Sequence, residues 1–205
     1  MKTLLSLLLM AVLLAGCVKP QTNNPFKAEE YLPGQNGSYW IYQMYVSDSL
    51  GNFTAQGPTD SAAVVNMQGY VSDTRKVIWR IPSFSTGEYV ANGANLYDPD
   101  GNLIMADPAT TGIIEKDTIS MNTDPDFIWE SRMVRDLPVT VPAGSFVSHQ
   151  YRKQITWSRY FIPGAENYIG YNFVKGVGLV SIRTFYYNQP NLLVEYRLVR
   201  YNIVN

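Results

Sequence analysis

The chain has 205 residues, with 16 basic and 17 acidic side chains, and its formal net charge is −1. No arginine-rich or lysine-rich run occurs, so the sequence argues against a nucleic acid as partner. One histidine and one cysteine exclude histidine-rich metal sites and a disulfide within the chain.

The N-terminus has the pattern of an export signal. Met1-Lys2 is a short positive head, and an apolar run of eleven residues follows over 4–14. A helix that spans a bilayer needs about 20 apolar residues, so this run predicts a cleaved secretory signal and not a membrane segment.

The residues Leu14-Ala15-Gly16-Cys17 resemble the lipobox of bacterial lipoproteins. The resemblance implies that the sulfur of Cys17 receives a diacylglyceryl group and that the chain is cut before this cysteine. The alternative is an ordinary cleaved signal with a coincidental cysteine. We expect a signal peptide over 1–16, a lipidated cysteine with a polar tether over 17–24, and a single β domain over 25–205.

The residue after the cysteine bears on location. By resemblance to the lipoprotein sorting rule, Val18 in place of aspartate implies the bacterial outer membrane. The acidic stretch that often follows the cysteine of surface-exported lipoproteins is missing. This favours the periplasmic face over the cell surface.

One short helix and one two-faced strand open the domain. Asn24 can cap a helix over 25–32, with Pro25 at its first position and Pro33 ending it. The segment 37–46 predicts a strand that is at least half covered on both faces, which is typical of a central strand or of a curved sheet. One face carries Trp40, Tyr42, Met44 and Val46, and the other carries Tyr39, Ile41 and Tyr45.

Shorter elements follow as far as residue 134. Apolar alternation and β-branched residues predict strands, and Asp98-Pro99-Asp100-Gly101 predicts a tight turn. We expect strands over 62–71 and 74–81, a hairpin over 95–105, a loop over 107–115, and strands over 113–121 and 127–134.

The stretch 137–201 supplies the long strands on which the rest packs. Val141-Pro142-Ala143-Gly144 predicts a type I turn closed by a glycine bulge, a three-residue hairpin loop. Alternation after this turn, and again after a looser segment, predicts antiparallel strands with one buried face and one wet face. The buried set is Val147, His149, Tyr151, Ile155, Trp157, Val180, Ile182, Thr184, Tyr186, Leu192, Val194, Tyr196 and Leu198, and the wet set of the first strand is Ser148, Gln150, Arg152, Gln154 and Thr156.

These elements predict an all-β, mainly antiparallel fold of about ten strands with at most one short N-terminal helix. The helices that parallel crossovers require are missing. We expect a strongly curved sheet, a half-barrel or a barrel-like form. The pattern alone does not choose between a closed barrel, a half-barrel and a sandwich.

Three short motifs resemble a recurring set in Gram-negative envelope lipoproteins. The set has an N-terminal G-x-x-W-x-Y segment, a central V-P-A-G-T-F turn and a late G-V-G-L-V turn. Ser145 replaces the usual threonine, and Ser181 stands where lysine is common. Such proteins are similar to the half-barrel LolA/LppX-like carriers of lipoproteins and lipids, and the resemblance supplies no catalytic residue. The motifs in this chain lie at 37–42, 141–146 and 176–180.

No combination of residues in the sequence predicts catalysis, a metal or a cofactor. His149 lies mid-strand on the apolar face, which favours a hydrogen-bonded core histidine over a catalytic one, and no G-x-S-x-G motif accompanies it. Asp98, Asp100 and Asn102 match the first ligand positions of a calcium loop. However, Gly101 comes one residue early and Ala109 stands where glutamate is required, so turn chemistry explains them better. We expect a protein that is not an enzyme.

Three Asp-Ser/Thr-apolar triplets resemble an O-glycan acceptor site of some envelope proteins. Their hydroxyl residues are Ser49, Ser61 and Thr118. Aspartate and serine in ordinary turns give an equally good explanation. Modification would require these three side chains to be exposed.

Two functional hypotheses fit, and a third is weaker. The first is a binding module whose aromatic-rich concave face holds a lipid, an acyl chain or another apolar small molecule, since the chain has 8 Phe, 4 Trp and 15 Tyr. The same aromatics would also fill the core of a β domain. The second is a structural or protein-interaction component of the envelope, with an envelope protein as partner, and the third is a glycan or peptidoglycan hydrolase. The candidate ligand-binding residues are Trp40, Tyr42, Tyr151, Trp157 and Tyr186.

Overall fold

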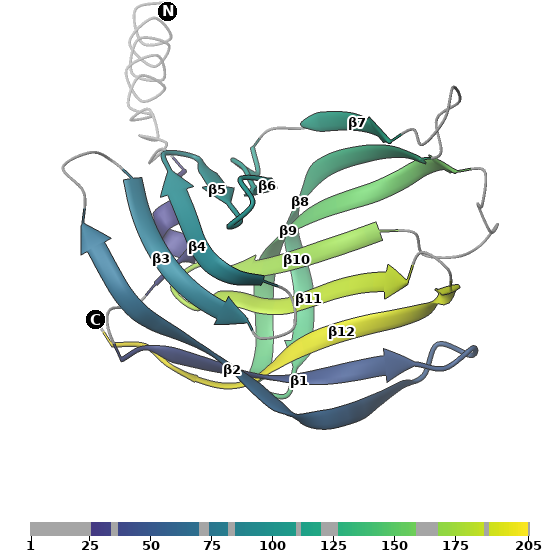
Figure 1. Ribbon diagram of the computed structural model, residues 1–205, viewed down its shortest axis with the longest axis horizontal. Helices are drawn as coiled ribbons and strands as arrows, with labels where there is room; N and C mark the ends of the chain where they lie inside the picture. The colour runs from purple at the N-terminus through teal and green to yellow at the C-terminus, as the bar shows by residue number, and fades with distance from the viewer. Residues whose placement is uncertain are drawn as a thin grey trace, which may run out of the picture.

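The computed structural model describes residues 26–33, 37–69, 74–81, 85–109, 112–119, 127–158, 168–186 and 189–204. Within these residues, twelve strands form one hydrogen-bonded antiparallel series in the order β6-β5-β4-β3-β2-β1-β12-β11-β10-β9-β8-β7 (Figure 1). This confirms the predicted all-β, antiparallel class. The strands are β1 (Tyr39–Ser47), β2 (Phe53–Gly69), β3 (Thr74–Ile81), β4 (Ser85–Asn92), β5 (Asn95–Tyr97), β6 (Leu103–Met105), β7 (Glu115–Ile119), β8 (Phe127–Val141), β9 (Gly144–Ser158), β10 (Tyr168–Val174), β11 (Gly178–Tyr186) and β12 (Gln189–Asn202).

Strand β3 and the β5–β6 hairpin lie where the sequence predicts them, whereas β4 and β10 are absent from the predicted elements. Strand β10 contains Gly170 and Asn172, two residue types that favour turns. It forms because β9 and β11 pair with both of its edges and because Phe173 is fully buried. Tertiary packing therefore overrides local propensity in this strand.

The predicted helix is shorter than expected. A 3-10 helix, η1, covers Ala28–Tyr31, and its N-cap residue Lys27 makes no capping hydrogen bond through its side chain. Main-chain contacts hold it instead, since Ala28 N donates to Gly93 O at 3.0 Å and Gly176 N donates to Glu30 O at 2.9 Å. The expected cap and first residue lie outside the described residues.

One face of the central strands, here called the core face, carries the main hydrophobic cluster. It presents Trp40 from β1, Tyr151 from β9 and Phe173 from β10, each at most 2% exposed. Strands β4–β6 and η1 pack into the same cluster through residues such as Tyr89 and Met105. The predicted burial of Val180, Ile182, Val194, Tyr196 and Leu198 is confirmed, but the predicted wet face of β11 is wrong at Ser181, which is 6% exposed.

Hydrogen bonds connect the three sequence motifs across this core. Trp40 Nε1 donates to Val177 O and Tyr42 Oη donates to Leu179 O, each at 2.7 Å, so the first motif bonds to the third. Burial raises the pKa of Tyr42 well above its ordinary value of 10, which keeps its hydroxyl a donor. In the second motif, Ala143 N donates to Leu198 O of β12 at 3.0 Å. The motif residues thus join distant strands, which is a structural role.

A β-bulge divides the long β8–β9 hairpin. Arg135 and Asp136 of β8 lie opposite the single residue His149 of β9, and Asp136 has a φ of 51°. Such a bulge bends the strand. Beyond it, the hairpin tip (137–148) passes across β10–β12 (Figure 1). The tip pairs Val141 with Gly144, so its loop has two residues and the predicted three-residue loop is wrong.

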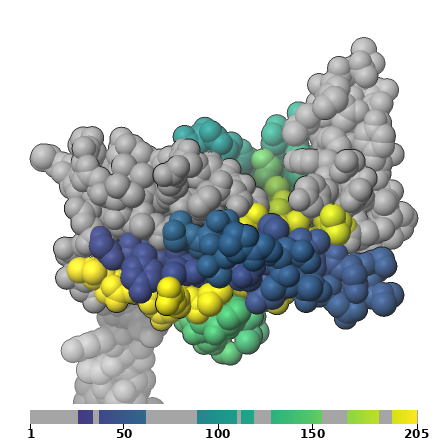
Figure 2. Space-filling view, turned by 60° about the horizontal axis from the view of Figure 1, so that its bottom comes forward, coloured from purple at the N-terminus to yellow at the C-terminus, as the bar shows by residue number. Residues whose placement is uncertain are grey.

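The predicted wet face of β9 is wrong near the tip. Val147, expected to be buried, is 65% exposed, whereas Ser148 and Gln150 are 1% and 3% exposed. The bend places the tip of β8 over the polar side chains and turns Val147 outward. Figure 2 shows the hairpin tip (green) projecting beneath β12 (yellow), with β1 and the described part of β2 beside it.

Candidate pocket on the polar face of β9–β12

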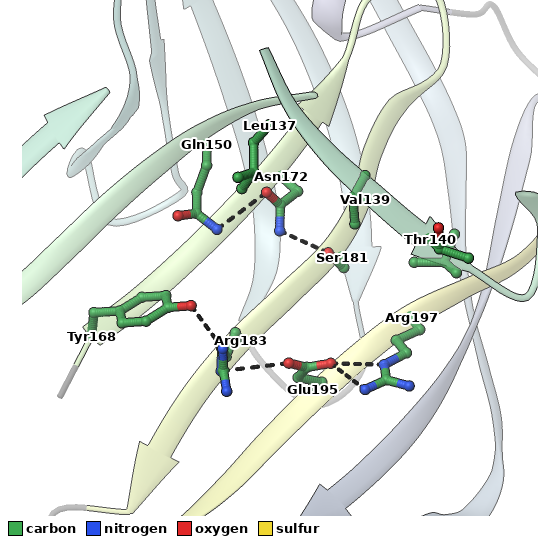
Figure 3. A pocket seen from close by; sticks show the side chains of 11 residues that line it. Leu137, Val139, Thr140, Gln150, Tyr168, Asn172, Ser181, Arg183, Glu195 and Arg197 are labelled. Carbon is green, nitrogen blue, oxygen red and sulfur yellow. Dashed lines mark hydrogen bonds and ion pairs between the residues drawn. The ribbon is translucent and has the colours of Figure 1, made fainter. Parts of the chain in front are cut away.

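A pocket of about 250 Å³ lies between the hairpin tip and the polar face of β9–β12, the face opposite the core face. The tip supplies an apolar wall with Leu137 and Val139, and the sheet supplies a polar floor (Figure 3). Two parallel rows of side chains make up this floor. The lining residues are Leu137, Val139, Thr140, Val141, Gln150, Tyr168, Asn172, Ser181, Arg183, Glu195 and Arg197.

The first row, here called the amide row, consists of Gln150, Asn172 and Ser181 on three neighbouring strands. These residues are direct cross-strand partners, so their side chains meet on one face. Gln150 Nε2 donates to Asn172 Oδ1 at 3.2 Å, and Asn172 Nδ2 donates to Ser181 Oγ at 2.9 Å. A Cβ at Gly170 would lie 3.0 Å from Gln150 Nε2, so the missing side chain makes room for this amide.

The second row, here called the ionic row, runs through Tyr168, Arg183, Glu195 and Arg197. Arg183 Nη1 donates to Tyr168 Oη at 2.8 Å, and Arg183 Nε lies 3.4 Å from Glu195 Oε1. Arg197 Nε and Nη2 both contact Glu195 Oε2, at 2.7 and 2.6 Å. One carboxylate therefore holds two guanidinium groups, and all three side chains are at most 25% exposed.

Aromatic rings contact the guanidinium groups of Arg152 and Arg197. The guanidinium of Arg197 lies 4.5 Å from the ring centroid of Tyr45 and 4.7 Å from that of Phe53. Arg152, whose Nε donates to Gln150 Oε1, lies 4.3 Å from the ring centroid of Tyr168. Cation–π contacts of this kind fix the orientation of an arginine while leaving its charge unneutralised.

The described side chains of this site include more cationic than anionic groups. Among the described lining residues, Arg183 and Arg197 contribute +2 and Glu195 contributes −1, which leaves +1. Arg152 at the edge raises the local sum to +2. Fixed guanidinium groups with surplus charge, next to amides and hydroxyls, are suited to binding a carboxylate or phosphate.

No family model and no curated protein matches this chain. Among solved structures, the chain is similar to an exported protein of Bacteroides fragilis with a YmcC-like fold, at 15% identity and a TM-score of 0.48 over 83% of this chain and 97% of that one. It is also similar to a lipoprotein of Parabacteroides distasonis, at 14% identity and a TM-score of 0.44 over the same shares of the two chains.

The structure places three of the five predicted ligand-binding aromatics in the hydrophobic core. Trp40, Tyr42 and Tyr151 are at most 2% exposed, and burial raises the pKa of Tyr151 to about 12. None of the three lines the pocket. For Trp157 and Tyr186 the structure describes the strand backbone and not the side chains. Packing within the core therefore accounts for the three aromatics that can be placed.

Arg183, Glu195 and Arg197 belong to no motif in the sequence and were not predicted as site residues. The signal was present in the alternation of β11 and β12, where these residues occupy the face opposite the buried one. Their meeting depends on the register that pairs Arg183 with Glu195 and Ser181 with Arg197. Register is a property of strand pairing, and the pattern within one strand does not show it.

The single histidine has structural partners. His149 is half-buried, its ring centroid lies 5.5 Å from that of Tyr31, and its Nδ1 accepts a long hydrogen bond of 3.5 Å from Asp136 N. Burial lowers the pKa of His149 below its ordinary value of 6.5. These contacts match the expectation of a hydrogen-bonded core histidine.

The aspartates of the two tight turns are occupied by main-chain bonds. Asp98 Oδ1 accepts from the amides of Asp100 and Asn102 at 3.0 and 2.8 Å, as turn chemistry predicts. Asp48 does the same for its own turn. The part of the chain with defined placement contains no cluster of three potential metal ligands.

The three candidate O-glycan acceptors, Ser49, Ser61 and Thr118, are all exposed. Their exposure meets the condition for modification and does not test it. Cys17 lies outside the described residues. Among the residues that are described, no helix is long and apolar enough to cross a membrane.

Proposed function

We propose that the chain is a bacterial envelope lipoprotein, anchored through Cys17 at the periplasmic face of the outer membrane, whose β domain binds a small ligand in the pocket beneath the hairpin tip. The lipobox-like residues before the sole cysteine support the anchor. The built, partly buried ionic row supports the binding function.

The sheet that carries the pocket is a curved half-barrel in this proposal. Met105 of β6 and Tyr151 of β9 share one hydrophobic cluster, although eight strands separate β6 and β9 in the strand order. A flat sheet would hold these strands far apart, because neighbouring strands lie about 4.8 Å apart. Curvature brings the core face inward and leaves the pocket on the outer face.

The ligand of this proposal is polar, unlike the apolar ligand that the aromatic content suggested. The observation that carries it is the pair Arg183 and Arg197 on one carboxylate, in a pocket somewhat smaller than the ~300–1,000 Å³ of typical small-molecule sites. The proposal does not include catalysis. Among the described lining residues, Glu195 is the one carboxylate, whereas glycoside hydrolysis ordinarily uses two.

The binding function is tested on the full-length protein in detergent by native mass spectrometry. We expect a bound small molecule to accompany the wild type and to be lost from Arg197→Met. Arg200→Met is the matched control, because Arg200 is an exposed arginine of the same strand and does not line the pocket. A species retained equally by all three proteins lies elsewhere, and a wild type without any bound species, even after incubation with envelope extract, refutes the binding function.

The anchor has its own test. Cys17→Ala should abolish incorporation of radiolabelled palmitate and release the protein from outer-membrane fractions. Palmitate incorporation that persists in the variant would place the lipid on another residue and refute the anchor.

A further inference from the structure

We infer that the pocket selects a small hydroxylated organic anion, one carboxylate or phosphate on a body about the size of a monosaccharide. The inference rests on the proposed binding function and names the chemical class of its ligand. Its support comes from three features of the described lining: two guanidinium groups on one carboxylate, fixed donors, and a row of amide and hydroxyl groups.

In the described part of the ionic row, two guanidinium groups share one carboxylate. Glu195 Oε2 takes both contacts from Arg197, and Glu195 Oε1 takes the contact from Arg183. Among the described lining residues, Glu195 is the one carboxylate, and its contacts with Arg197 involve Nε and Nη2, so a carboxylate or phosphate of a ligand can bind at Nη1. A neutral ligand would gain no charge attraction from these guanidinium groups, and a cation would be repelled by them.

The donors of Arg197 are already oriented. Glu195 Oε2 contacts Nε and Nη2 of Arg197, and the rings of Tyr45 and Phe53 make cation–π contacts with the Arg197 guanidinium. Within the described residues, no hydrogen bond or ion pair engages Arg197 Nη1. An anion that binds there meets a guanidinium whose side-chain entropy has largely been lost on folding, which favours affinity.

The rest of the lining suits hydroxyl groups. The amide row lies beside the ionic row, and Thr140 and Ser181 add hydroxyls that both donate and accept (Figure 3). Leu137 and Val139 form a wall against which a carbon ring can lie. A long acyl chain would force this polar floor to lose hydration without replacement hydrogen bonds.

Isothermal titration of the full-length protein in detergent tests the class with four probes: glucuronate, glucose 6-phosphate, glucose and octanoate. We expect at least one of the two sugar anions to bind at least tenfold more tightly than glucose and octanoate. Arg197→Met should weaken that binding at least tenfold, and Arg200→Met should change it less than twofold. Raising the salt from 50 to 500 mM should also weaken it, because the attraction is electrostatic.

The outcomes separate the two proposals. Tighter binding of glucuronate assigns a carboxylate, and tighter binding of glucose 6-phosphate assigns a phosphate; either supports the class. Binding of octanoate or glucose with equal affinity, lost in Arg197→Met, overturns the class while the pocket remains a binding site. Binding of the sugar anions that survives in Arg197→Met overturns both. If Arg197→Met fails to fold, Arg197→Lys keeps the charge but loses the planar fork and should still weaken binding several-fold.

Discussion

The two faces of strands β9–β12 differ in how they use buried side chains. On the core face, Phe173, Ile182 and Leu198 pack at most 1% exposed against strands β4–β6 and η1. On the pocket face, Asn172, Arg183 and Glu195 alternate with them along the same strands and are held by polar contacts. Because side chains alternate along each strand, one sheet has a face that packs the core and a face that we propose binds a ligand.

The core face should respond most strongly to truncation. Phe173→Ala removes a fully buried ring from the middle of β10, and the lost burial and the cavity left behind should lower the free energy of unfolding by about 3–5 kcal/mol. Denaturant unfolding of the two proteins measures the difference. Val147→Ala, at a 65% exposed position, serves as control and should stay within about 0.5 kcal/mol. A loss below about 1 kcal/mol in Phe173→Ala would contradict the packed core.

The hydrogen bond from Tyr42 to Leu179 O gives the next largest effect. Tyr42→Phe keeps the ring but leaves the buried carbonyl of Leu179 without this donor, which should cost about 1–3 kcal/mol. Equilibrium unfolding measures the cost, with Tyr201→Phe at a partly exposed position as the control. Equal stability of Tyr42→Phe and the wild type would show that this bond does not help to hold β1 to β11.

The class and many of the strands could be predicted from the sequence, because alternation and turn residues are local. The pocket could not. It depends on the bulge opposite His149, which moves the tip of β8 over Ser148 and Gln150. It depends also on the register that joins Arg183 to Glu195. The same limit explains the aromatics, since Trp40 donates to a carbonyl of the β10–β11 turn and Tyr42 to a carbonyl of β11, a strand two places away, and no local pattern identifies these partners.

Acid should lower the free energy of unfolding through protonation of His149. Burial lowers its pKa below 6.5, and Arg135 lowers it further, whereas Asp136 and Asp107 oppose this. The unfolded chain therefore binds the proton first, so this contribution to stability is complete above pH 6.5 and is lost as the pH falls through the folded-state value. His149→Phe keeps a ring against Tyr31 and cannot titrate. Comparing the free energy of unfolding at pH 7.5 and 5.5 should give a smaller acid loss in this variant than in the wild type, and an equal loss would contradict the assignment.

The pocket face should contribute least to stability. Arg197→Met removes a guanidinium but leaves Glu195 paired with Arg183, and the methionine side chain can still cover Tyr45 and Phe53. Ion pairs that retain contact with solvent contribute about 0–1 kcal/mol, so the free energy of unfolding should fall by about 1 kcal/mol or less. Denaturant unfolding of Arg197→Met beside Arg200→Met provides the measurement. A loss as large as that of Phe173→Ala would mean that the ionic row is part of the structural core, and the division between a stabilising face and a recognising face would fail. A small loss of stability combined with weakened anion binding would show that Arg197 contributes more to ligand binding than to the stability of the fold.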